Sequence, residues 1–233
     1  MPTAPAALGR LVEGRIGRSA RVTSVRAPAP GFLEVEMDAE APPGGWHPGH
    51  EVQFRVTPTQ GRRYTVRSVS GPDARRIGLL AATAADGPGT DFLRRLRPGD
   101  RTTVLAGRHR PLRERGARRL YTGDASALGT LDALAGGGSS PTVVVEVPAR
   151  AAAWVAETRP AFHVLAAAPD PGAELLRRLE RELREGAFTE VDGAVLLGHA
   201  GTVQRARRTL LAAGLDRGAC TVRAYWAEGK RGL

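Results

Sequence analysis

The sequence contains a single cysteine, Cys220, among its 233 residues. One cysteine forms no internal disulfide and no cysteine-built metal cage, so a reducing compartment is expected. No apolar run approaches the roughly 20 residues that a membrane-spanning helix requires. The segment 1–21 lacks the apolar core of a secretory signal. These absences predict a cytoplasmic protein with no membrane partner.

Aromatic residues are also scarce, at 5% of the chain, and they are not interleaved with basic residues. Proteins that bind single-stranded nucleic acid stack bases on aromatic side chains, and DNA-binding proteins present a recognition helix. Neither pattern is present. Nucleic acid is therefore not the expected partner.

Lysine is almost missing, because every one of the 34 basic residues except Lys230 is arginine. The formal net charge is +10. A positive surface attracts anions in general, including acidic redox proteins and anionic chelates, and does not select among them.

Several catalytic motifs are absent as well. The five histidines show no metal-ligand spacing such as H-E-x-x-H, so no metal site is expected. No serine or cysteine lies in a G-x-S-x-G turn, which leaves hydrolysis without support. The chain also has no G-x-G-x-x-G dinucleotide fingerprint.

The first half of the chain consists of short, partly alternating apolar segments separated by turns. Closely spaced strands of this kind predict a small antiparallel β-barrel. The expected strands are residues 20–25, 32–37, 50–56, 62–69, 76–81 and 102–107.

A glycine-rich turn at 86–89 precedes a short helix, for which Thr90 is the predicted N-cap. Free N–H groups at such a helix start can bind a pyrophosphate. An ordinary turn followed by a capped helix explains the same residues equally well.

The second half alternates strands with helices, which is typical of an α/β layer with a parallel sheet. It follows an arginine-rich stretch, 108–118, that we expect to be an interdomain linker. The expected strands are 119–123, 142–147, 161–166, 194–197 and 222–226, with helices after Asp124, over 174–185 and after Thr202.

The segment Gly61-Arg62-Arg63-Tyr64-Thr65-Val66-Arg67 combines groups that suit a flavin. Arg62 can donate two hydrogen bonds to a phosphate, and Tyr64 offers a flat face for a ring. On a strand these two side chains share a face and Thr65 points away. Thr65 then reaches the ring only where the strand twists or ends, or through its backbone. An edge strand with solvated arginines is the alternative reading.

R-x-Y-T-V-R after a barrel-like first half resembles the siderophore-interacting proteins, which are FAD-dependent ferric-siderophore reductases of the ferredoxin-reductase-like superfamily. The resemblance extends to Leu120–Leu128, to the V-V-V-E-V-P strand at 143–148, and to Tyr225-Trp226. It implies a flavin-binding β-barrel domain over residues 1–115 and an α/β reductase-like domain over 116–233.

The resemblance also implies roles for particular residues. Those expected at the FAD are Arg62, Tyr64, Thr65, Val66, Arg67, Gly87, Pro88, Gly89, Thr90 and Trp226, although Trp226 can equally pack the domain interface. Those expected at a nicotinamide nucleotide are Gly123, Asp124 and Ser126. Departures occur at Ala125, Ser126 and His199, where the family usually has Glu, Thr and an acidic residue.

The implied activity is reduction of an Fe(III) chelate to release Fe(II), with NAD(P)H or ferredoxin as electron donor. Arg55, Arg108 and Arg110 are the substrate candidates. The departures keep two alternatives open: a flavoenzyme that tailors an organic natural product, and a flavin-free binding module. For the iron reductase and for the tailoring enzyme alike, the expected partner is a small molecule. No single catalytic side chain is expected, because the cofactor carries the redox chemistry.

Overall fold

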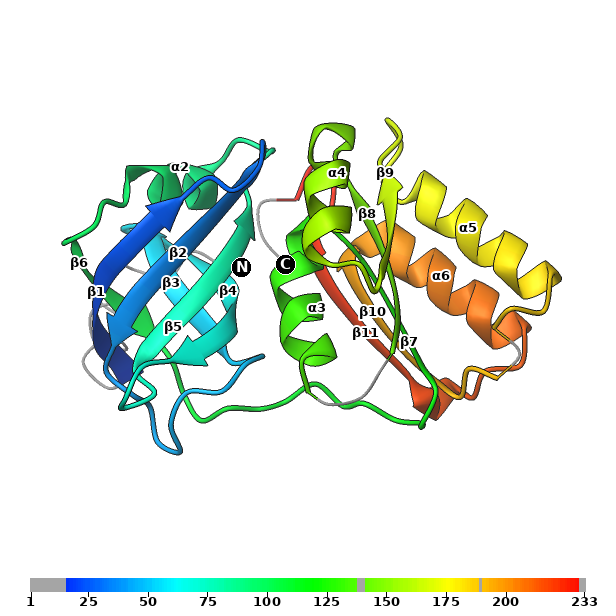
Figure 1. The fold of residues 1–233 in the computed structure, drawn as a ribbon, viewed down its shortest axis with the longest axis horizontal. Coiled ribbons are helices and arrows are strands. Elements are labelled where there is room, and N and C mark those ends of the chain that lie inside the picture. Colours follow the sequence, from blue (N-terminus) through cyan, green and yellow to red (C-terminus); the bar gives the residue numbers. More distant parts are fainter. Residues whose placement is uncertain (1–15, 138–140, 189, 231–233) are drawn as a thin grey trace. The chain divides into compact units, whose positions relative to one another are not determined.

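A computed structural model describes residues 16–137, 141–188 and 190–230. Residues 1–15, the larger part of the N-terminal segment 1–21, therefore lie outside the described residues. The chain forms two compact units, one up to Pro111 together with Asp132–Leu134, and one comprising the rest. The elements, coloured along the chain in Figure 1, are β1 (Gly17–Arg26), β2 (Phe32–Ala39), β3 (Glu51–Thr57), β4 (Gln60–Ser70), β5 (Arg76–Ala82), α2 (Pro88–Arg95), β6 (Arg101–Leu105), β7 (Arg119–Asp124), α3 (Leu128–Ala135), β8 (Thr142–Val147), α4 (Ala149–Thr158), β9 (Phe162–Ala166), α5 (Ala173–Arg184), β10 (Gly193–His199), α6 (Ala200–Ala212) and β11 (Cys220–Trp226).

The first unit is the predicted barrel. Its six strands close in the order β1-β2-β5-β4-β3-β6, with β6 pairing back onto β1. Apolar side chains alternate along β3, where Val52, Phe54 and Val56 are buried in the interior and the residues between them are half-exposed. The antiparallel barrel expected from the short alternating segments is confirmed.

Helix α2 packs against the barrel core through Leu93, while Leu96 at its C-cap is buried in the same cluster. It begins one turn earlier than predicted. Gly87 is the N-cap and Pro88 occupies the first turn, whereas the Thr90 hydroxyl donates to the carbonyl of Ala85 at 2.8 Å. The prediction of Thr90 as N-cap is therefore wrong, because proline supplies the helical φ that starts the helix.

The second unit is a five-stranded parallel sheet of order β11-β10-β7-β8-β9. Helices α5 and α6 lie on one face, and α3 and α4 lie on the other (Figure 1). The strand order reverses between β7 and β10. Ligands of open α/β sheets bind outside the carboxyl ends of the strands at such a reversal, so this edge of the sheet is a candidate ligand-binding site.

The second part of the predicted linker is bound to the α/β unit. The Asp192 carboxylate accepts the backbone N–H groups of Ala117 at 3.1 Å and Arg118 at 2.8 Å. The Tyr121 hydroxyl donates to Glu114 at 2.5 Å, and the Thr221 hydroxyl donates to the carbonyl of Arg113 at 2.6 Å. Residues 113–118 are thus an ordered border of this unit.

No helix in the described part of the chain combines the length and the apolar character that crossing a membrane takes.

Candidate functional site

Strand β4 presents the Arg62 and Tyr64 side chains on one face. In the β3–β4 register, Phe54 is opposite Arg62 and Val52 is opposite Tyr64. Paired residues of neighbouring strands point to the same side of a sheet. Arg62 and Tyr64 therefore lie on the side of the barrel interior, at the end that α2 covers.

Tyr64 is held in this position by aromatic packing. Its ring centroid lies 5.8 Å from that of Phe54, which in turn lies 5.4 Å from Phe92 of α2. Burial raises the pKa of the Tyr64 hydroxyl to about 12, against the opposing effect of the Arg62 charge. The hydroxyl therefore remains protonated at neutral pH and can donate a hydrogen bond.

The N-terminus of α2 meets the same two side chains. A Cβ atom added at Gly89 would lie 2.8 Å from the Tyr64 hydroxyl and 3.1 Å from Cγ of Arg62. The N-cap residue of α2 is Gly87, so no side chain caps the first N–H groups of the helix. A helix start without a side-chain cap, next to an arginine, attracts a phosphate through both its N–H groups and its dipole.

The structure thus brings together Arg62, Tyr64 and the turn Gly87–Thr90, which the sequence analysis assigned to one cofactor from two separate motifs. Glycine at position 89 allows this close approach, because a side chain there would crowd the Tyr64 hydroxyl and the stem of Arg62. This arrangement fits the pyrophosphate and ring of FAD. The stem of Arg62, the Tyr64 side chain and the uncapped start of α2 meet at Gly89, and the Arg62 guanidinium donates to the carbonyl of Gly61 at 2.8 Å.

The other residues expected at the flavin are placed differently. Val66 is fully buried in the barrel core, and its backbone N–H and carbonyl bond to His50 and Gly49, each at 2.8 Å. Arg67 donates to the Glu34 carboxylate at 2.6 Å. Thr65 is paired with Glu51 on the opposite face of the strand from Tyr64. Val66 and Arg67 therefore make contacts that support the barrel.

The carboxyl ends of β7, β10 and β11 meet at the carboxylate of Asp124. One carboxylate oxygen accepts the Ser126 N–H at 2.9 Å and the Ser126 hydroxyl at 2.5 Å. The other accepts the backbone N–H of His199 and the indole N–H of Trp226, both at 2.8 Å. The side chain of Asp124 therefore joins the strands on both sides of the strand-order reversal.

Two glycines allow this close approach. A Cβ at Gly123 would lie 2.8 Å from the Ala127 side chain, and one at Gly198 would lie 2.5 Å from the Asp124 carboxylate. Trp226 packs on His199, with ring centroids 4.5 Å apart. The structure thus brings Gly123, Asp124, Ser126 and Trp226 together at one edge of the sheet.

Glu146 is a buried group at this edge that the sequence analysis did not single out. It is 4% exposed, and its carboxylate accepts the N–H groups of Gly172 at 3.0 Å and Leu175 at 2.8 Å, at the start of α5. Burial raises the pKa of the Glu146 carboxyl. The signal in the sequence is one charged residue inside a run of β-branched residues.

We expect Asp124→Asn to weaken the hydrogen bond of Trp226. An amide has one acceptor oxygen in place of two, so either the Ser126 donors or the His199 and Trp226 pair lose their acceptor, and the bonds that remain are no longer charge-assisted. The indole resonance of Trp226, assigned with Trp226→Phe, should shift in an NMR spectrum and its N–H should exchange faster with solvent. An unchanged indole resonance in Asp124→Asn would show that this hydrogen bond does not form in solution.

The arginines proposed for substrate do not form one group. Arg108 and Arg110 line a hollow beside β3, whereas Arg55 is not among the residues that line it. No set of three His, Cys, Asp or Glu side chains within the described residues is arranged to hold a metal ion.

Solved structures share this succession of a closed antiparallel barrel and a five-stranded parallel sheet over nine-tenths of the chain. The siderophore-interacting protein from Acinetobacter baumannii superposes with a TM-score of 0.75 at 16% identity, over 91% of each chain. A siderophore utilization protein from T. fusca gives a TM-score of 0.71 at 22% identity, over 93% of this chain and 95% of that one.

An electron-transfer protein shares the fold as well. The ferredoxin reductase in carbazole 1,9a-dioxygenase gives a TM-score of 0.70 at 20% identity, over 90% of this chain and 69% of that chain. No protein-family model and no curated protein matches the sequence. The resemblance to siderophore-interacting proteins is thus confirmed in the fold.

Proposed function

We propose that this chain is an FAD-dependent oxidoreductase that reduces Fe(III) chelates. The observation that carries the proposal is the convergence of Arg62, Tyr64 and the uncapped start of α2 around Gly89. The similarity in fold to siderophore-interacting proteins supports it. In this proposal residues 1–115 form the flavin-binding domain and residues 116–233 form the reductase-like domain.

The residues of the barrel have distinct tasks in this function. Arg62 and the N–H groups at the start of α2 bind the negative phosphates, and Tyr64 orients the ring system. A bound FAD would supply the redox chemistry, since a flavin can accept two electrons and pass them on singly. Fe(II) binds hard oxygen ligands less tightly than Fe(III), so reduction releases the iron from its chelate.

The proposed electron donor is NAD(P)H or reduced ferredoxin. The carboxyl edge of the sheet supports the first, because Gly123, Asp124 and Ser126 lie at the strand-order reversal where dinucleotides bind in open α/β sheets. The fold shared with a ferredoxin reductase supports the second. Reduction of the flavin-loaded protein by NADH, NADPH or reduced ferredoxin, followed in separate anaerobic reactions, discriminates between them.

We expect ferric chelates to reoxidise the reduced, flavin-loaded protein faster than air does, with Fe(II) trapped by a coloured chelator. The rate should rise with the negative charge of the chelate and fall with added salt, because exposed charges are screened over about 10 Å at 0.1 M ionic strength. Stopped-flow absorbance gives both rates. If no ferric chelate exceeds the rate in air, the iron function is wrong and tailoring of an organic substrate becomes the better assignment.

A further inference from the structure

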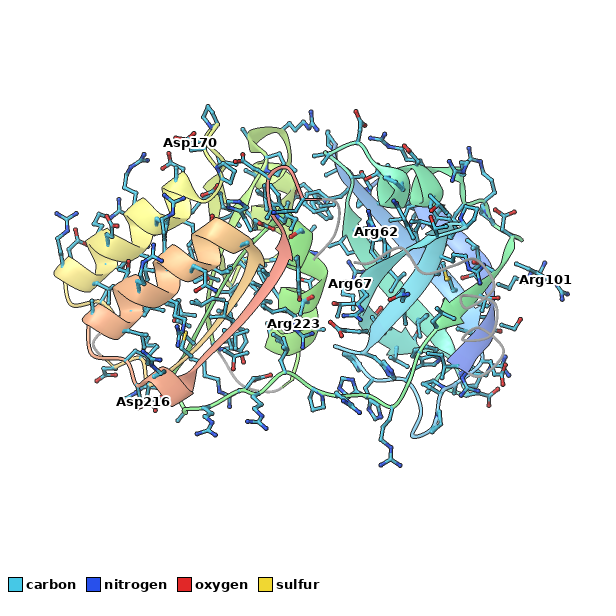
Figure 2. All side chains as sticks on the ribbon, turned by 180° about the vertical axis from the view of Figure 1, so that it is seen from behind. Arg62, Arg67, Arg101, Asp170, Asp216 and Arg223 are labelled. Atoms are coloured by element: carbon cyan, nitrogen blue, oxygen red, sulfur yellow. The ribbon has the colours of Figure 1, made fainter. Side chains whose placement is uncertain are left out.

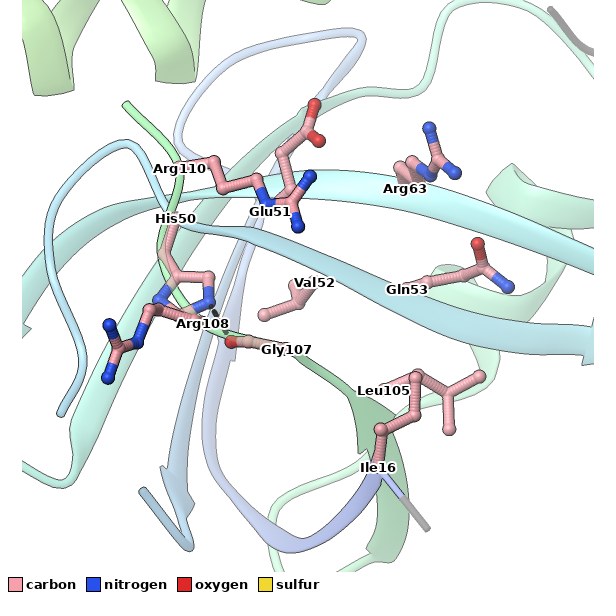
Figure 3. A pocket seen from close by; sticks show the side chains of 10 residues that line it. All are labelled: Ile16, His50, Glu51, Val52, Gln53, Arg63, Leu105, Gly107, Arg108 and Arg110. Atoms are coloured by element: carbon pink, nitrogen blue, oxygen red, sulfur yellow. Dashed lines mark hydrogen bonds between the residues drawn. The ribbon is translucent and has the colours of Figure 1, made fainter. Parts of the chain in front are cut away.

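A hollow of about 360 Å³ lies beside β3 and β4 of the barrel unit (Figure 3). The segment that follows β6 forms another of its walls. Strands β3 and β6 pair there only through Gln53 and Leu105, and both of these residues line the hollow. Its volume falls in the lower part of the range of small-molecule sites, roughly 300–1,000 Å³.

Three arginines surround this hollow: Arg63 of β4, and Arg108 and Arg110 of the segment after β6. Among the residues that the structure describes, none of the three takes part in an ion pair. Among the lining residues that the structure describes, Glu51 is the one carboxylate. Three guanidinium groups against one carboxylate leave a net positive lining.

Histidines fix the segment that carries two of these arginines. A ring nitrogen of His50, Nε2, lies 2.9 Å from the carbonyl oxygen of Gly107. The ring of His109 stacks on His47 with centroids 5.2 Å apart and lies 5.1 Å from His50. Arg108 and Arg110 flank His109, so their backbone positions are set by these contacts.

His50 and His109 add little charge of their own. Burial lowers the pKa of both His50 and His109, and the proximity of the other imidazoles lowers it further. Neutral imidazoles at pH 7 leave the arginines as the source of the positive charge.

The hollow is separate from the flavin site on the barrel. Arg63 is paired with Gln53, whereas Arg62 is paired with the buried Phe54. Successive side chains of a strand point to opposite faces, so Arg63 lies on the outer face and Arg62 on the inner one. Arg62 and Tyr64 are not among the described residues that line the hollow, so a ligand there is held by other side chains.

We propose that this hollow binds a small anion that carries two or more carboxylate or phosphate groups. Each guanidinium presents a planar fork of donors that matches either group in a bidentate manner. The Gln53 amide supplies a further donor on the same face. Several arginines around one volume favour a polyanion over a monoanion, because each charged group of the ligand finds its own partner.

The test is calorimetric titration of the full chain with citrate, pyrophosphate and acetate at one ionic strength. We expect citrate or pyrophosphate to bind saturably and acetate not to bind. Arg63→Gln and Arg108→Gln should each weaken that binding about ten-fold or more, which corresponds to the loss of one charge-assisted contact. The tighter of the two anions identifies carboxylate or phosphate as the preferred group.

Arg101→Gln is the matched control, since it removes the same charge from an exposed position on β6. Figure 2 shows Arg101 and Arg62 at opposite sides of the barrel unit. Arg101→Gln should bind citrate or pyrophosphate as the wild type does, whereas pyrophosphate binding that is lost in Arg62→Gln belongs to the flavin site. If neither polyanion binds better than acetate, or if Arg101→Gln weakens binding as much as Arg63→Gln, the proposal is wrong. FAD affinity, measured on the same variants, reports separately on the flavin site.

Discussion

Arg62→Gln is expected to weaken FAD binding roughly ten- to a hundred-fold, because a charge-assisted phosphate contact contributes about 1.5–3 kcal/mol. The stem of Arg62 passes beside Gly89 at the uncapped start of α2, and its guanidinium donates to the carbonyl of Gly61 at 2.8 Å, so the cation and the helix dipole both favour a phosphate here. Glutamine keeps the length of the side chain and one donor, and it loses the charge and the fork. Fluorescence titration of the apo-protein with FAD measures the change.

Arg63→Gln is the matched control for this prediction, since it changes the same residue type one position along the strand, on the opposite face. It should leave FAD affinity unchanged. Equal losses in the two variants would mean that only the net charge of the barrel matters to FAD. Unchanged affinity in both Arg62→Gln and Tyr64→Ala would remove the flavin assignment from this strand.

Glu146→Ala is expected to lower the unfolding free energy of the α/β unit by about 2–4 kcal/mol, because the two N–H groups at the start of α5 lose their acceptor. Both hydrogen bonds are buried, and β8, which carries Glu146, has a neighbouring strand on each side. Urea unfolding followed by circular dichroism measures the loss. Glu157→Ala, at an exposed position on α4, serves as control and should have little effect.

The pH dependence gives a second test of Glu146. Burial raises the pKa of its carboxyl, so the protonated form is favoured in the folded chain. Its contribution to stability is therefore fully present below the pKa of the unfolded chain, about 4.3, and declines as pH rises through the folded value. The stability difference between wild type and Glu146→Gln should accordingly shrink as pH rises from 4. A difference that grows over this range contradicts the raised pKa.

Most of the fold could be predicted from the sequence, because alternation and β-branched runs are local signals. Val52, Phe54 and Val56 alternate in β3 as they do in the sequence, and residues 142–147 form the predicted buried strand. Helix α4 was not predicted. Its alanine-rich segment buries only Ala151 and Val155, so the spacing of apolar residues gives no clear helical period.

The candidate site could be predicted in its parts and not in its geometry. R-x-Y-T and the turn 87–90 were each recognisable, yet their contact through Gly89 depends on how α2 packs on the barrel. The roles of Asp124 and Glu146 depend on backbone N–H groups that lie 75 and 26 residues away along the chain. A local sequence pattern does not reveal which donor such a distant acceptor will meet. The opposite faces of Arg62 and Arg63, in contrast, follow from strand alternation alone.

The visible absorption spectrum of the full chain, recorded after incubation with FAD and removal of the excess, decides whether the barrel holds a flavin. Flavin absorption bands should remain with the protein at one FAD per chain, and they should be lost on the same treatment of Arg62→Gln. A colourless wild-type protein after this treatment would show that the barrel is not a flavin site and would favour a flavin-free binding module.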